Sequence, residues 1–430
     1  MNRDALIASD RRHLWRPYTS SEDHERYEPL IVERAEGPYL YDETGRAILD
    51  ASGSWWCNNL GHRHPRIVDA LKRQADRLMH CSFGGSTHET TIALAEELIA
   101  RAPEGFSRVF FSDNGSSAVE IAAKMAFQYF QQNGAKARRR FLSLSGAYHG
   151  DTIGAMSLGS ASAFHAVFDP LKFEVVHAPE PEDKSWENVA RFIEETLEAE
   201  GDQFAALIVE PIVQGAGGMR IYPKDILRRF REATKEAGVL LIVDEVFTGY
   251  GRTGPFWAVE HAGVIPDLIA AAKGLSAGAL PFAATLATET IYDGFRGDKS
   301  RALLHGHTFY GNPLGAAVAL ETLKIYREEN ILEIAKERAN QLERGMHQLR
   351  AIEGVNGVRS IGMVAALELG EDGYFGERGW RASRKALELG AQIRPLGDTL
   401  YLVPPLNIPQ DALEKLLEIT RAAIVHSLEG

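Results

Sequence analysis

Cysteine is scarce in this chain: its 430 residues include only Cys57 and Cys81. Two cysteines without a C-x-x-C spacing exclude a disulfide framework and a redox or zinc motif. A single disulfide between them is left open, although reduced thiols in a cytoplasmic protein are the expectation. A chain of this length buries enough apolar surface to be stable without cross-links.

Long apolar segments and an excess of positive charge are also missing. The aliphatic runs are short; Val239 to Val243, for example, falls far below the roughly 20 residues of a membrane helix. Residues 1–15 are charged throughout and lack the apolar segment of a signal peptide. The 47 Lys and Arg against 59 Asp and Glu give a formal net charge of −12, which offers no basic face for nucleic acid. We expect a cytoplasmic protein that binds neither membrane nor nucleic acid.

Short apolar stretches alternate with segments of helical periodicity, a pattern typical of an α/β fold with a largely parallel sheet. Apolar positions recur at helical spacing between Thr90 and Ala102, and a further helix is predicted from about Ser116. Buried strands are predicted at Val109–Phe111, Phe141–Leu144, Ala205–Val209, Val239–Val243 and Leu268–Ala271.

The two ends of the chain show a different pattern. A hairpin is predicted over Tyr39–Leu49, although its pattern does not say on which body it packs. The C-terminal part combines helices and alternating strands, predicted at Ile331–Ile352, Val364–Leu369, Thr399–Val403 and Gln410–Leu428. This mixture indicates a smaller α+β domain.

Lys273 and Asp244 each follow a predicted apolar strand, which places both at the edge of the sheet where α/β folds bind ligands. A partly desolvated lysine there can act as an amine nucleophile or form a Schiff base. An aspartate can keep a pyridine nitrogen of a cofactor protonated. Taken singly, a solvated loop lysine and a helix-capping aspartate are the simpler interpretations.

Gly249, Gly251 and Gly254 formally match the G-x-G-x-x-G pattern of dinucleotide-binding proteins. That function requires the glycines to open a helix directly after the strand. Because Pro255-Phe256-Trp257 follows without a helix start, we interpret the match as coincidental.

Two segments could bind a phosphate through backbone amides and hydroxyls. Gly115 and Ser116 precede a predicted helix, where simple N-capping is the alternative. Gly306-His307-Thr308 is the second candidate. The pairs His62/His64 and His305/His307 have no carboxylate beside them in the sequence, and we interpret them as structural rather than as metal ligands.

Aromatic residues and one arginine are further candidates. Tyr148 could stack on a flat cofactor, and Trp55-Trp56 could line an apolar pocket, although such rings are more often part of a core. Arg394 could bind a substrate carboxylate with two hydrogen bonds, with an exposed surface arginine as the alternative.

Together, in this order, these residues resemble the class III aminotransferases, which use pyridoxal 5′-phosphate (PLP). The resemblance covers essentially the whole chain. It is carried by the segments RRHLWRPYTS (11–20), SGSWW (52–56), FGGSTHE (83–89), YHGDTIGAMS (148–157), EPIVQGAGGM (210–219), DEVFTGYGRTG (244–254), HGHTFYGNPL (305–314) and IRPLG (393–397).

The resemblance implies a fold-type I architecture. A large domain (61–325) would hold a mostly parallel seven-stranded sheet, and a small α+β domain would combine both chain ends (1–60 and 326–430). It also implies a homodimer with shared active sites.

The resemblance further implies roles for individual residues. Lys273 would bind PLP covalently, Asp244 would pair with its ring nitrogen, and Tyr18 would take part in catalysis beside them. Gly115, Ser116, Tyr148 and Glu210 would contact the cofactor, and Thr308 would reach the phosphate in the partner subunit. The substrate residues would be Tyr18, Trp55, Trp56, Tyr148, Asp151, Lys273, Gly306 and Arg394, with no metal ligand among them.

The W-x-PYTS and SWW segments are closest to the family members of biotin biosynthesis, which transfer the amino group of S-adenosylmethionine to 8-amino-7-oxononanoate. Leu396 and the HGHT segment (305–308) look closer to a variant that uses lysine as the donor. A general ω-amino-acid aminotransferase, a PLP mutase and a non-catalytic binding protein are the other hypotheses. Retention of both Lys273 and Asp244 argues against the last.

Overall fold

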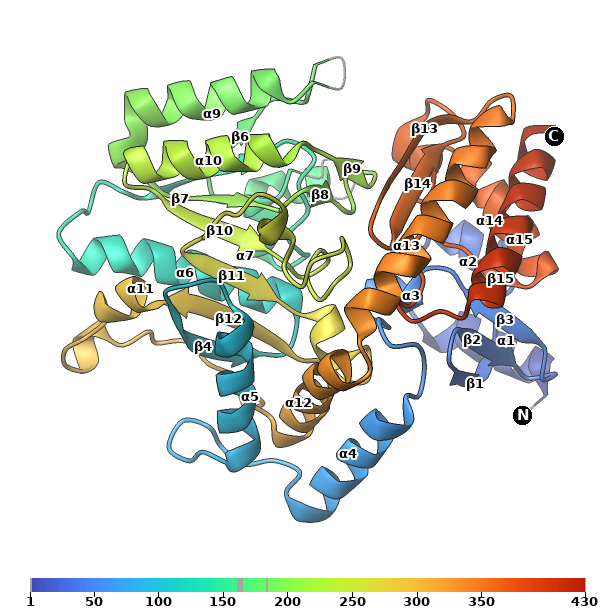
Figure 1. Ribbon diagram of the computed structural model, residues 1–430, viewed down its shortest axis with the longest axis horizontal. Coiled ribbons are helices and arrows are strands. Elements are labelled where there is room, and N and C mark those ends of the chain that lie inside the picture. The colour runs from blue at the N-terminus through green and yellow to red at the C-terminus, as the bar shows by residue number, and fades with distance from the viewer. Residues whose placement is uncertain (1, 161–164, 183–184, 430) are drawn as a thin grey trace.

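The protein is described here from a computed structural model that covers residues 2–160, 165–182 and 185–429. Its centre is a seven-stranded sheet with the order β4-β12-β11-β10-β7-β5-β6 (Figure 1). The strands are β4 (Phe106–Ser112), β5 (Arg140–Leu144), β6 (Val176–Ala178), β7 (Phe204–Val209), β10 (Leu240–Asp244), β11 (Leu268–Ala271) and β12 (Ala283–Thr288). Strand β12 is antiparallel to both neighbours, and the other pairs are parallel. The predicted mostly parallel α/β sheet is confirmed.

Helices cover both faces of this sheet, which explains why its strands are continuously apolar. Alternate residues of β10 enter different core clusters: Ile242 packs with helix α6 (Gly115–Gln132), whereas Leu241 and Val243 pack on the opposite face. The helices of the opposite core include α5 (Glu89–Arg101), α9 (Glu187–Glu200), α10 (Lys224–Glu236) and α12 (Pro313–Glu328).

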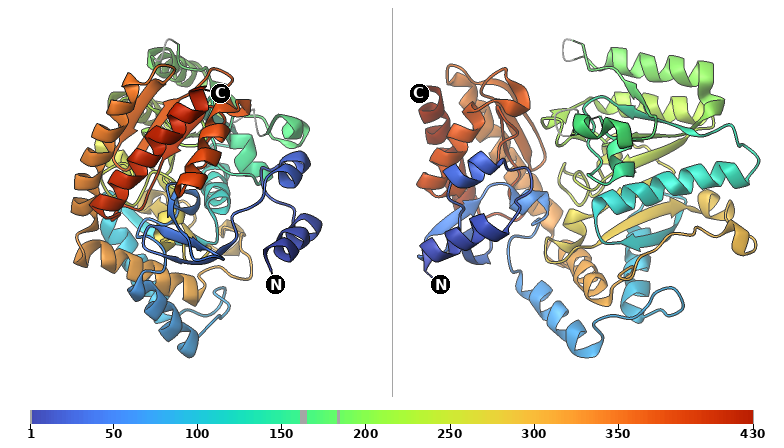
Figure 2. Two further views of the ribbon diagram at one scale, coloured as in Figure 1. Left: turned by 90° about the vertical axis from the view of Figure 1, so that its right-hand side faces the viewer. Right: turned by 180° about the vertical axis from the view of Figure 1, so that it is seen from behind.

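A second body lies beside the large sheet and is built from both chain ends, as the two views of Figure 2 show. Its four-stranded sheet has the order β1 (Val32–Glu36), β2 (Tyr39–Asp42), β3 (Ala47–Asp50) and β15 (Ala391–Gln392). Its three-stranded sheet contains β13 (Asn356–Ile361), β14 (Val364–Glu368) and β16 (Thr399–Leu402). Because β3 pairs with β15, the N-terminal hairpin packs on the C-terminal part of the chain.

The helices of the second body are α1 (Arg3–His13), α2 (Ser21–Arg26), α13 (Ile331–Gln348), α14 (Arg378–Leu389) and α15 (Gln410–Glu429). The predicted elements of this region are present within a few residues of their expected bounds. The domain boundaries at residues 60/61 and 325/326 stay a prediction. None of the helices in the described ranges combines the length and the apolar character that a membrane crossing requires.

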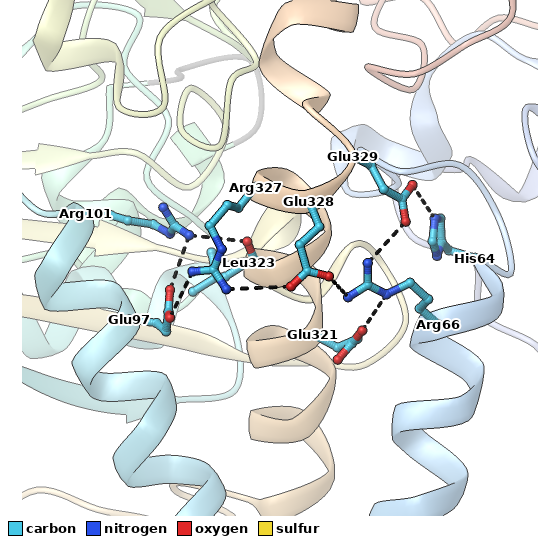
Figure 3. A network of polar contacts seen from close by, with 9 residues as sticks. All are labelled: His64, Arg66, Glu97, Arg101, Glu321, Leu323, Arg327, Glu328 and Glu329. Carbon is cyan, nitrogen blue, oxygen red and sulfur yellow. Dashed lines mark hydrogen bonds and ion pairs between the residues drawn. The ribbon is translucent and has the colours of Figure 1, made fainter.

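The end of α12, where the chain passes toward the second body, is held by ion pairs to α5 and α4 (Pro65–Arg77) (Figure 3). Arg66 contacts three carboxylates of this region, those of Glu321, Glu328 and Glu329. The remaining pairs are His64–Glu329, Arg101–Glu97, Arg327–Glu97 and Arg327–Glu328. Each partly exposed pair contributes about 1 kcal/mol or less, so the network fixes geometry more than it adds stability.

Candidate active site

A cavity of about 640 Å³ opens at the carboxyl ends of the central strands. Eleven of the thirteen predicted site residues line it: Tyr18, Trp55, Trp56, Gly115, Ser116, Tyr148, Asp151, Glu210, Asp244, Lys273 and Arg394. Gly306 and Thr308 do not line the cavity of their own chain. The predicted role of Thr308 requires a second subunit.

Lys273 lies two residues after the end of β11, and its backbone has a positive φ of 46°. Burial lowers the pKa of its amino group, a change that is opposed by the negative charges of Asp244 and Glu210. The Nζ atom lies 4.4 Å from the ring centroid of Trp56 and 5.7 Å from that of Phe247. Lys273 is therefore a desolvated amine at the floor of the cavity, as expected from its position after an apolar strand.

Asp244 is the last residue of β10 and is almost completely buried. Its Oδ2 lies 2.8 Å from Nδ1 of His149, and its Oδ1 accepts a hydrogen bond from the amide of Val246 at 3.0 Å. The buried carboxylate is thus held in a fixed orientation. His149 had no role in the prediction from sequence, and its place directly after Tyr148 was the available signal.

Glu210, just after β7, is a second buried carboxyl group of the cavity. It accepts hydrogen bonds from the amides of Tyr148 at 3.2 Å and Gly215 at 2.9 Å. Burial raises the pKa of Glu210 to about 7. A proton is therefore available on this side chain near neutral pH, in contrast to an exposed glutamate.

The N-terminus of α6 forms another wall of the cavity. Asn114 caps the helix by accepting a hydrogen bond from the amide of Ser117 at 2.9 Å. A Cβ atom at Gly115 would lie 2.7 Å from Cγ1 of Val246, so any other residue here would force the Val246 side chain to move. Capping by Asn114 leaves Gly115 and Ser116 at the cavity, where amides of a helix start favour an anion.

Asp151 connects three side chains at the mouth of the cavity. Its carboxylate accepts hydrogen bonds from Tyr18 Oη at 2.6 Å, Tyr148 Oη at 2.9 Å and His165 Nε2 at 3.0 Å. Burial opposes the charge, but the bonds from His165 and the two hydroxyls hold the pKa of Asp151 below its usual value. The ring of His165 stacks on that of Tyr148 with the centroids 5.9 Å apart. A fixed negative charge therefore borders the space beside Tyr148.

Arg394 supplies a positive charge from the second body. Its guanidinium lies 4.1 Å from the ring centroid of Trp55, and the Trp55 ring is 5.7 Å from that of Tyr18. Tyr374 also lines the cavity and forms a hydrogen bond with Arg394. No periodic or motif signal in the sequence pointed to Tyr374. The cavity thus offers a cation and an anion, Arg394 and Asp151, to a substrate.

The glycine-rich loop after β10 has a structural role. Arg252 within it is fully buried and donates hydrogen bonds to the carbonyls of Pro404 at 2.7 Å and Met363 at 3.2 Å, and to Oδ1 of Asn59 at 2.7 Å. The loop therefore ties the large sheet to the second body, in agreement with the rejection of a dinucleotide motif.

The other sequence candidates have simple structural partners. His62 contacts Asp50, His64 contacts Glu329, and His307 contacts Asp113. In the described part of the chain, no group of three His, Cys, Asp or Glu side chains has the arrangement of a metal site. Cys57 and Cys81 are free thiols, so the open disulfide alternative is excluded.

The family model described as aminotransferase class III matches residues 19–424 of this chain. The chain belongs to the class III aminotransferases. The relatives include the adenosylmethionine-8-amino-7-oxononanoate aminotransferases of Synechococcus elongatus, 43% identical over 94% of this chain and 96% of the relative, and of Nitratidesulfovibrio vulgaris, 41% identical over 99% and 83%.

Two solved structures show the same fold. The adenosylmethionine-8-amino-7-oxononanoate aminotransferase of Methanocaldococcus jannaschii superimposes with a TM-score of 0.95 at 37% identity, over 98% of this chain and 99% of that one. An ω-transaminase of Pseudomonas jessenii, solved in complex with PMP, gives a TM-score of 0.92 at 30% identity, over 99% and 98%. The architecture is that of the PLP-dependent fold-type I enzymes.

Class III aminotransferases depend on PLP, and the cavity residues fit this group. The cavity combines a desolvated lysine, a buried carboxylate fixed by a histidine, an aromatic ring and a capped helix N-terminus next to glycine. These four features match an aldehyde, a pyridine nitrogen, a flat ring and a phosphate, respectively.

Proposed function

We propose that this chain transfers the amino group of S-adenosylmethionine to 8-amino-7-oxononanoate in biotin biosynthesis, giving 7,8-diaminononanoate by a ping-pong mechanism. The observation that carries the proposal is that Lys273, just after β11, and Asp244, at the end of the neighbouring strand β10, line one cavity. Full-length similarity to proteins that carry this activity in their names supports the choice of substrates.

The cofactor residues act together in this proposal. Lys273 would hold the cofactor covalently and, once free, would move a proton at the donor's α-carbon as a general base. Asp244 holds the proton on the ring nitrogen, and His149 holds Asp244 in place. When bound, PLP supplies the electron sink for the proton transfer.

The remaining cofactor contacts come from three elements. Gly115 and Ser116, at the start of α6, would hold the phosphate, and Tyr148 would stack on the ring; all three line the cavity. Glu210, whose pKa is raised to about 7 by burial, would lie on the side of the ring oxygen.

The substrate pocket must accept two unlike molecules in turn. Trp55, Trp56 and Tyr18 supply aromatic walls, which suit both substrates better than dedicated ion pairs would. Asp151 borders the pocket at its mouth, and Arg394 binds the carboxylate of the keto substrate with two hydrogen bonds.

A homodimer in the cytoplasm completes the proposed enzyme. Thr308 would reach the cofactor phosphate in the partner subunit, and Gly306 would border the partner's substrate pocket. In support of this arrangement, the neighbouring side chains Leu304 and Phe309 are 86% and 58% exposed within a single chain.

The test is a product assay on the PLP-loaded enzyme with 8-amino-7-oxononanoate and one donor at a time. We expect 7,8-diaminononanoate, identified by mass spectrometry, with S-adenosylmethionine as donor. If 7,8-diaminononanoate formed with lysine but not with S-adenosylmethionine, the donor would be lysine, as in the lysine-using variant. Amino transfer from ω-amines to pyruvate or 2-oxoglutarate, without 7,8-diaminononanoate, would instead establish a general ω-aminotransferase.

A further inference from the structure

The amino group of Lys273 contacts aromatic faces rather than polar partners. Its Nζ lies 4.4 Å from the ring centroid of Trp56 and 5.7 Å from that of Phe247. Among the described residues, no hydrogen bond or ion pair to this atom is found. Asp244, Glu210 and the Cys57 thiol act on it through space. The free lysine thus rests on an indole face within the cavity.

The backbone around Trp56 is strained into the position that makes this contact. Ser54, Trp55 and Trp56 have φ values of 46°, 75° and 73°. Residues other than glycine rarely adopt this left-handed backbone conformation. Such strain persists only where the surroundings hold it, and it often occurs at functional sites. Here the indole of Trp56, 3% exposed, packs against Phe247 at 4.6 Å and Tyr401 at 5.9 Å.

The two adjacent tryptophans serve different cations as a result. Trp55 lies under the guanidinium of Arg394 at 4.1 Å, whereas Trp56 lies under the amino group of Lys273. An aromatic face within about 6 Å attracts a cation, most strongly where water is excluded. The sequence predicts that both rings line the substrate pocket. In the structure, Trp55 contacts Arg394 and Trp56 contacts Lys273.

We propose that Trp56 is a positioning residue for Lys273, and that its indole face is the seat that the lysine amino group occupies whenever it is not bound to the cofactor. The proposal rests on the proposed role of Lys273. An aminotransferase lysine is released when the donor amine replaces it, and it then accepts and returns one proton. A fixed seat keeps the released amine within reach of the reacting carbon, and the ring stabilises its protonated form against the effect of burial.

The test uses the full-length enzyme in its pyridoxamine phosphate form, in which Lys273 is free. Acetic anhydride is added in trace amounts at a series of pH values, and acetylation of Lys273 is measured by peptide mass spectrometry. The midpoint of this titration reports the pKa of Lys273, independently of turnover. We expect Trp56→Leu to lower the midpoint by about one pH unit, and Trp56→Phe to lower it less.

Trp55→Leu is the matched control, because it removes the neighbouring ring and leaves the contact of Trp56 with Lys273. Its midpoint for Lys273 should equal that of the wild type, since Asp244, Glu210 and Cys57 are unchanged in every variant. Phe247→Leu, which removes the more distant ring, should give a smaller decrease and serves if Trp56→Leu does not fold. An unchanged midpoint in Trp56→Leu, or an equal decrease in Trp55→Leu, would overturn the proposal.

The same titration on protein dialysed free of cofactor separates the two hypotheses. A decrease caused by Trp56→Leu in that protein supports the seat even if no amino transfer is found. Wild-type protein that fails to form a covalent link between Lys273 and PLP would overturn the proposed function, whereas the titration would still decide the role of Trp56.

Discussion

Nδ1 of His149 lies 2.8 Å from Oδ2 of Asp244, and both side chains are almost fully buried. His149 follows the cavity residue Tyr148 in a loop, whereas Asp244 ends β10, so the pair joins two residues that are 95 positions apart in the sequence. A buried carboxylate needs hydrogen bonds to stay charged and oriented. The pair therefore prepares Asp244 for a cationic ring nitrogen.

Replacing Asp244 tests this preparation. Asp244→Asn should lower kcat by several powers of ten, because a neutral pyridine is a poor electron sink. His149→Leu should lower kcat by about 10- to 100-fold, because leucine removes one hydrogen bond to the Asp244 carboxylate. Steady-state kinetics of both variants give the comparison. A mild effect of Asp244→Asn would refute its assigned role.

Lys273→Ala should abolish turnover and covalent cofactor attachment while some PLP stays bound through the remaining contacts. Borohydride reduction followed by peptide mass spectrometry detects the covalent link. Lys415→Ala, at an exposed position of α15, is the control and should keep both properties. Near-normal turnover of Lys273→Ala would be incompatible with its role.

Arg394→Ala should raise KM for 8-amino-7-oxononanoate by about 10- to 100-fold, because a charge-assisted contact to the carboxylate is lost. Arg394→Lys should recover part of this loss but not the two-bond geometry. Kinetics with each substrate varied separately measure the effect. If only the donor half-reaction became slower, the carboxylate would have been assigned to the wrong residue.

Arg252→Ala should lower the free energy of unfolding by about 3 kcal/mol or more, because three buried acceptors lose their donor. Burial lowers the pKa of Arg252 to about 10, so the side chain remains charged at neutral pH. Urea unfolding measures the change. Arg296→Ala, an exposed arginine, should change stability little, and an equal loss there would argue against the tie to the second body.

Glu245 predicts a pH dependence of stability. Burial raises its pKa from 4.5 to about 7, although the carboxyl accepts hydrogen bonds from Thr248 and Val259. The folded state therefore binds a proton that the unfolded state releases between these values, and stability falls as the pH rises through this window.

Thermal unfolding between pH 5 and pH 7.5 follows this effect. Glu210 has the same raised pKa, so Glu245→Gln should remove about half of the pH-dependent decrease. An unchanged slope in Glu245→Gln would show that Glu245 does not carry the proton. Each unit of difference between the folded-state and unfolded-state pKa changes the free energy of unfolding by roughly 1.4 kcal/mol.

The central sheet and the cavity floor could be predicted because they depend on local patterns. The buried strand Leu268–Ala271 is present as predicted, and Lys273 lies at its carboxyl end. Strand β12 (Ala283–Thr288) escaped prediction, since three of its six residues are alanine, which is depleted in strands.

The cavity residues that were missed are those whose role arises from tertiary contacts. Tyr374 follows the short loop after β14 and reaches Arg394 only when the second body is assembled. His149 gains its role from Asp244, far away in the sequence. The difference between Trp55 and Trp56 depends on three residues with left-handed backbone conformation. Only glycine favours that conformation, so serine and tryptophan give no sign of it in the sequence.

The most direct test of the account is a single-turnover measurement on the purified, PLP-loaded enzyme mixed with S-adenosylmethionine, with lysine as the parallel control. We predict that the absorbance band of lysine-bound PLP disappears with S-adenosylmethionine and stays with lysine. A band that persists with S-adenosylmethionine would contradict the proposed donor. In that case, loss of the band with lysine would assign the lysine-using variant. A band that persists with both donors would point to a general ω-aminotransferase.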